Sequence, residues 1–184
     1  MELPLPFFSA DGRKMGLSQI AEDGSIRVWV LDAATGTPEG EFSAPPSPSD
    51  RLLVPPLLGA GRGAFGPGGR LAVWAGGDLV TWAGPGAAPV RLTGHDLGRS
   101  VAFSEDGRRA FTVDTTDPGA GGSGQTLRVW ELVGGRELIT LRIPDERTGT
   151  DPGGPARYDV WLEGERLHVM TPTGVRVFDG TPLK

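Results

Sequence analysis

The sequence contains no cysteine and only two histidines. The absence of cysteine excludes disulfide bridges, cysteine-ligated zinc and thiol catalysis. Two histidines among scattered carboxylates do not form a metal-binding pattern, so no metal site is predicted. The sequence also lacks the Gly-x-Ser-x-Gly motif of many serine hydrolases. No catalytic residue is assigned, and we expect a protein that is not an enzyme.

Long basic or apolar runs are missing as well. The net charge is −5, and no run of Lys or Arg exceeds two residues, which disfavours nucleic acid and anionic membranes as partners. No apolar run approaches the roughly 20 residues of a membrane span. The N-terminus lacks the basic start and apolar stretch of a signal peptide. The expected location is therefore cytoplasmic.

Glycine and proline, in contrast, are abundant, at 30 and 17 residues. They are spread between short apolar segments, a pattern that favours many short strands joined by turns over long helices. Pairs such as Asp106-Gly107 supply the backbone conformation that tight hairpins need.

One strand-turn pattern recurs along the chain. Each copy has an apolar strand, a turn, a second strand, a third strand carrying an aromatic residue, a glycine turn and a fourth strand. The copies occupy about 5–42, 64–93, 100–142 and 157–179, and the last stops after its third strand. Because one such sheet cannot bury both of its faces, the copies are expected to stack.

The third-strand aromatic residues mark the length of the repeat. They are separated by 53, 48 and 48 residues, which is slightly more than the roughly 40–45 residues of a propeller blade. They are Trp29, Trp82, Trp130 and Phe178.

Several segments resemble the WD-repeat family. Residues 22–29, 101–109 and 127–132 are similar to its first and third strands, and Gly94-His95 is similar to its Gly-His pair. The degenerate pattern resembles bacterial members attached to signalling domains. The resemblance implies an all-β β-propeller of about four four-stranded blades, in an open or partial ring.

The same resemblance implies a hydrogen-bonded cluster in the third copy. In the family, a His, a Ser or Thr, an Asp and a Trp form a buried tetrad. His95, Thr112 and Trp130 correspond to three of these residues, and Asp114 could supply the acid. No copy keeps an intact Trp-Asp pair, so apolar packing is expected to hold the blades together.

An incomplete ring leaves apolar blade faces uncovered. We therefore expect either the C-terminal part of a larger propeller or an eight-blade homodimer.

Three long segments, 43–63, 114–125 and 144–157, are expected at one end of the blades. Insertions on one face of a repeat array often mark its binding face, although surface loops also tolerate insertion without function. The charged residues to test there are Arg51, Asp117, Arg147, Asp151 and Arg157.

No cofactor is predicted. Residues 61–66 match the dinucleotide fingerprint formally, but Pro67-Gly68-Gly69 forbids the helix that this motif needs.

The leading functional hypothesis is a protein–protein interaction scaffold within a larger signalling protein. One alternative is a propeller enzyme or small-ligand binder with its site at the channel axis. Another is a degenerate propeller fragment.

Overall fold

A computed structural model describes residues 5–46, 63–75, 77–95, 97–116, 124–144, 159–171 and 174–179. Regular structure in these ranges is antiparallel β-sheet, apart from a 3-10 turn at Pro67–Gly69. Within the same ranges, no helix has the length and hydropathy needed to cross a membrane.

The strands form four separate sheets that follow one another along the chain. Blade 1 contains β1 (Leu5–Phe8), β2 (Lys14–Ile20), β3 (Ile26–Asp32) and β4 (Pro38–Ala44). Blade 2 contains β5 (Gly63–Phe65), β6 (Leu71–Ala75), β7 (Asp78–Trp82) and β8 (Val90–Leu92). Blade 3 contains β9 (Leu97–Phe103), β10 (Arg109–Thr116), β11 (Gly124–Glu131) and β12 (Arg136–Pro144). Blade 4 contains β13 (Asp159–Glu163), β14 (Arg166–Thr171) and β15 (Gly174–Asp179).

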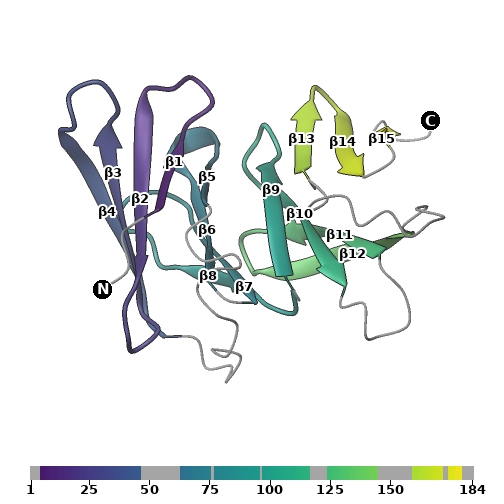
Figure 1. Cartoon of the computed structure of the whole chain (residues 1–184), viewed down its shortest axis with the longest axis horizontal. Coiled ribbons are helices and arrows are strands. Elements are labelled where there is room, and N and C mark those ends of the chain that lie inside the picture. Colours follow the sequence, from purple (N-terminus) through teal and green to yellow (C-terminus); the bar gives the residue numbers. More distant parts are fainter. Residues whose placement is uncertain are drawn as a thin grey trace, which may run out of the picture.

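Every sheet is a meander in which strands adjacent in sequence are hydrogen-bonded neighbours. Figure 1 shows the sheets side by side, with blade 1 and blade 4 at opposite ends of the molecule. The predicted all-β propeller, built as a partial ring, is confirmed.

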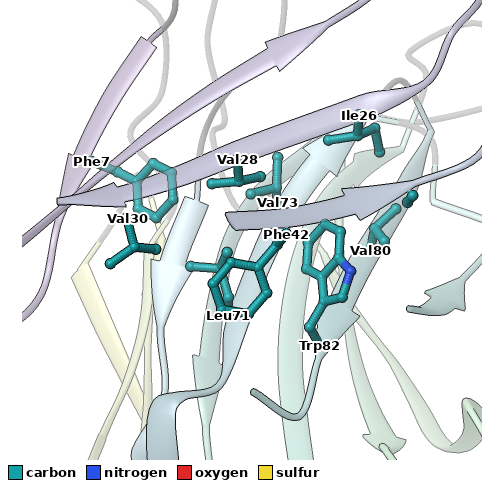
Figure 2. Packing of buried hydrophobic residues seen from close by; sticks show 10 residues of the cluster. Phe7, Ile26, Val28, Val30, Phe42, Leu71, Val73, Val80 and Trp82 are labelled. Carbon is teal, nitrogen blue, oxygen red and sulfur yellow. The ribbon is translucent and has the colours of Figure 1, made fainter. Parts of the chain in front are cut away.

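One apolar cluster fills each interface between neighbouring blades. Side chains alternate along β7, so Val80 and Trp82 pack against blade 1 while Leu79 packs toward blade 3. Figure 2 shows the first of these clusters, in which Phe42 of β4 lies edge-on to Trp82, with ring centroids 5.8 Å apart. Blade 2 is therefore apolar on both faces, as a blade between two neighbours must be.

Phe7 fixes how closely β1 approaches its neighbours. A Cβ atom on Gly16 would lie 2.2 Å from the Phe7 ring, and one on Gly63 would lie 2.5 Å from it. The ring therefore occupies space that only glycine leaves open, on its own blade and on blade 2.

The turn at Asp106-Gly107 repeats the turn at Asp11-Gly12. In blade 3, Ser104 Oγ donates to Asp106 Oδ1 over 2.6 Å, and Gly107 has a φ of 66°. In blade 1, Ser9 Oγ donates to Asp11 Oδ1 over the same distance. These hydrogen bonds hold the pKa of both carboxyl groups below the usual value.

Strand register changes the alignment of the first repeat. Arg109 and Lys14 are equivalent, because each carbonyl accepts a hydrogen bond from the serine that opens its turn. The next residue in blade 3, Ala110, pairs with Trp130, whereas the next residue in blade 1, Met15, pairs with Leu31. Leu31 is therefore the residue of blade 1 that corresponds to Trp130. Trp29 lies in the same third strand, two residues earlier.

Candidate functional site

A buried polar cluster joins blades 2 and 3. Thr112 on β10 is its centre: His95 Nε2 lies 3.0 Å from Thr112 Oγ1, and Trp130 Nε1 donates to the same oxygen over 3.0 Å. All three side chains are buried. The structure therefore brings together the three residues that the resemblance associates.

Aromatic rings enclose His95, which follows β8. The Trp74 ring of blade 2 meets the imidazole edge-on at a centroid distance of 4.8 Å. The Trp130 ring of blade 3 lies 5.1 Å away on a tilted plane. This cluster is enclosed by protein, and its contacts connect blade 2 to blade 3.

Asp114, the residue expected to supply the acid, lies beside Arg128. Its Oδ2 lies 3.6 Å from Arg128 Nε, and Arg128 Nη1 lies 3.0 Å from Glu137 Oε2. Burial opposes ionisation of Glu137, but hydrogen bonds from Thr140 and Arg128 hold its pKa below the usual value. Arg128 is thus held between two carboxylates on neighbouring strands.

Burial lowers the pKa of His95 from 6.5 to about 4, and the positive charge of Arg128 acts in the same direction. Neutral imidazole is therefore the form that the folded chain favours. Because Trp130 donates to Thr112 Oγ1, the Thr112 hydroxyl proton can point to His95 Nε2, which accepts a hydrogen bond only when unprotonated.

This pKa shift predicts a loss of stability in mild acid. Below pH 6.5 the unfolded chain binds a proton at His95, whereas the folded chain does so only near pH 4, so stability falls across that window. We expect the free energy of unfolding to fall by about 2 kcal/mol between pH 7 and pH 5. Urea titrations at several pH values measure it. His95→Gln should flatten the slope, and an unchanged slope in that variant would contradict the prediction.

The other blades build the same positions from apolar residues. Val73 and Val169 take the place of Thr112, and Trp82 and Phe178 take the place of Trp130. Trp82 Nε1 donates instead to the Ser43 carbonyl of blade 1, over 3.0 Å. In blades 2, 3 and 4 the third-strand ring thus faces the preceding blade, whereas Leu31 holds the same position in blade 1.

The proposed binding-face residues Arg51, Asp117, Arg147, Asp151 and Arg157 lie outside the described residues. In the described ranges, no group of three or more His, Asp or Glu residues is placed to hold a metal ion.

Blade 4 presents an apolar face away from blade 3. Leu167 and Val169 point into the blade 3–blade 4 interface, so His168 and Met170 lie on the opposite side of β14. Cross-strand pairing places Val177 beside His168 and Val175 beside Met170. Val175 and Val177 are 50% and 53% exposed. We call His168, Met170, Val175 and Val177 the C-terminal face.

Trp161 extends the C-terminal face onto β13. Its ring stacks on His168 at a centroid distance of 5.1 Å and an interplanar angle of 16°. The stacked pair is a flat aromatic surface beside the two exposed valines.

Blade 1 presents the matching apolar face away from blade 2. Val28 and Val30 point into the blade 1–blade 2 interface, so Trp29 and Leu31 lie on the other side of β3. Leu17 pairs with Trp29, and Met15 pairs with Leu31. All four are half-buried, and no blade formed by the described residues covers them. We call Met15, Leu17, Trp29 and Leu31 the N-terminal face.

Sequence reasoning predicted uncovered blade faces without assigning residues to them. The sequence does contain an indication of these residues, because Val175 and Val177 occupy the same strand positions as Val28 and Val30, which are buried in blade 1. Recognising this equivalence requires the strand register, and the spacing of the aromatic residues does not determine that register.

Solved structures with similar folds are β-propellers. Kuenenia stuttgartiensis hydrazine synthase matches with a TM-score of 0.56 and 15% identity, over 89% of this chain and 42% of that one. The β-propeller domain of the trilobed protease from Pyrococcus furiosus matches with a TM-score of 0.56 and 9% identity, over 91% and 48%. The mitotic checkpoint complex matches with a TM-score of 0.55 and 13% identity, over 97% and 49%.

These likenesses define the class of protein as β-propeller, and the chain spans less than half the length of each of the three chains. No protein-family model matches the chain, and no curated protein matches it significantly. The expectation that the chain is not an enzyme is corrected, because a synthase and a protease are among these neighbours. The propeller fold is one that enzymes use.

Proposed function

We propose that this chain is a WD-like interaction scaffold whose binding surfaces are its two terminal blade faces. The observation that carries the proposal is the pair of uncovered faces. The three interior interfaces each bury one apolar face against another, and blades 1 and 4 each retain one such face unpaired within the described residues.

The natural occupant of such a face is another β-sheet with alternating apolar residues. Interior interfaces pack sheet against sheet, and Trp82 shows how a large ring fills the space between two of them. Contiguous exposed apolar surface on a folded protein commonly marks a protein-binding site. The WD-like signs in the sequence and the checkpoint complex among the neighbours support the same function.

The test compares two valine variants in partner capture. A Val175→Glu/Val177→Glu double variant places charge on the C-terminal face, whereas Val133→Glu places it in the β11–β12 turn, where Val133 is 80% exposed. Partners cross-linked to the wild-type chain would be identified and purified. The dissociation constant of each purified partner would then be measured with the wild-type chain and with both variants.

We expect the double variant to bind a purified partner at least about tenfold more weakly than wild type, while Val133→Glu binds normally. Equal binding by all three chains would show that the C-terminal face is not the binding surface.

A second candidate is a small-ligand or catalytic site at the channel axis of a completed ring. The hydrazine synthase and protease neighbours favour it. Ligand binding to the folded state raises the midpoint of thermal unfolding by mass action. A concentration-dependent rise with a peptide or small metabolite would support this candidate, and a flat response across such a panel would count against it.

A further inference from the structure

We infer that the occupant of each terminal face is a second copy of this chain, so that two copies close one eight-blade ring. This inference rests on the proposed function, since it names the partner of those same faces. In such a ring, the C-terminal face of each copy packs on the N-terminal face of the other.

The interior interfaces define which faces fit together. In all three, each blade packs the side that faces the next blade in sequence against the side of that blade that faces back toward it. The C-terminal face of blade 4 is a side that would face a next blade. The N-terminal face of blade 1 is a side that would face a preceding blade. One chain therefore carries both halves of a fourth interface of the same type.

Equivalent positions show that the C-terminal face is built for burial. Val175 and Val177 correspond by register to Val28 and Val30 in blade 1, and to Leu127 and Val129 in blade 3. Those four residues are at most 8% exposed, whereas the two valines of blade 4 are about half exposed. These two positions of blade 4 are thus apolar even though no blade among the described residues covers them.

The N-terminal face shows the same relation. Met15, Leu17, Trp29 and Leu31 correspond to residues of blade 2 that are almost fully buried against blade 1. Those residues are Leu71, Val73, Val80 and Trp82. A blade 4 packed on this side would cover Leu31 in the way that blade 1 covers Trp82.

Blades 1 and 4 lie at opposite ends of the described structure, so the two faces do not meet within it (Figure 1). Size favours two copies as the closed assembly. The chain covers 48% of the Pyrococcus furiosus propeller domain, so two copies supply about one ring of that fold. A two-fold axis along the channel would make the two new interfaces identical and leave no face open.

The first measurement is the mass of the purified full chain in solution, by light scattering and sedimentation. We expect twice the 19.3 kDa mass of one chain. Val175→Glu/Val177→Glu should raise the dissociation constant of the dimer at least about 100-fold, because each interface would then bury two unpaired charges. Val133→Glu is the matched control and should remain dimeric.

A mixing experiment tests the head-to-tail arrangement. Leu31→Glu disables the N-terminal face, so it should also give a monomer, with circular dichroism showing that each variant is folded. Mixing the two monomeric variants should restore a dimer, since the intact C-terminal face of one fits the intact N-terminal face of the other.

A folded wild-type monomer at micromolar concentration would overturn the inference. So would a Leu31→Glu variant that stays fully dimeric, because it would indicate pairing of blade 4 with blade 4. If the wild-type chain is monomeric but its C-terminal face binds a different purified protein, the second-copy inference fails and the proposed scaffold stands. If it is monomeric and the face variants change no binding, both fail.

Discussion

Replacing Trp82 with alanine is expected to lower the free energy of unfolding by about 3–5 kcal/mol, the usual effect of truncating a large buried aromatic residue. Trp82 is 1% exposed and lies between blades 1 and 2, where it contacts the Phe42 ring. The substitution empties the centre of that interface and removes the hydrogen bond to the Ser43 carbonyl. Urea unfolding followed by circular dichroism measures the change.

Trp82→Phe separates the two contributions. It keeps an aromatic ring in the interface but removes the indole N–H, so the expected loss is only about 1–2 kcal/mol. If Trp82→Ala lost less than about 1 kcal/mol, the blade 1–blade 2 cluster could not be the main contact between these sheets.

The strands and turns were predictable because their chemistry is local. Alternating apolar residues and Asp-Gly turns require no information from distant parts of the chain. Ser9-Ala10-Asp11-Gly12 and Ser104-Glu105-Asp106-Gly107 show this, since both form the same hydrogen bonds. His95 was predictable only through the family resemblance, because nothing next to it in the sequence indicates that Trp74 of the distant strand β6 buries it.

The register of blade 1 shows where pattern reasoning failed. Trp29 and Leu31 lie two residues apart on one strand face, so alternation cannot decide which of them matches Trp130. The following turn decides it. Asp32 Oδ1 accepts from the Thr35 backbone N–H, as Glu131 Oε2 accepts from that of Gly134. The acidic residue was therefore a better marker than the tryptophan.

The uncovered faces could be expected from the sequence but not located, because exposure depends on what lies beside a blade. Nothing in Val175 or Val177 distinguishes them from the buried valines of β3. Only their 50% and 53% exposure reveals that a neighbour is lacking within the described chain.

Thr112→Val is expected to lower the free energy of unfolding by about 2–4 kcal/mol. Valine matches threonine in shape but removes the oxygen that Trp130 Nε1 and His95 Nε2 share. Both nitrogens would then be buried in the blade 2–blade 3 interface with that partner gone. Thr93→Val, at an exposed position just after β8, is the matched control and should change stability by less than about 0.5 kcal/mol.

A double-mutant cycle decides whether the loss comes from this network. Trp130→Phe removes one of the nitrogens that Thr112→Val leaves unpaired, so Thr112→Val should cost at least about 1 kcal/mol less in the Trp130→Phe background. Strictly additive losses would mean that Thr112 and Trp130 stabilise the blade interface independently. In that case the resemblance to a hydrogen-bonded tetrad would be one of geometry alone, and packing of Trp74 and Trp130 around His95 would hold the two blades together.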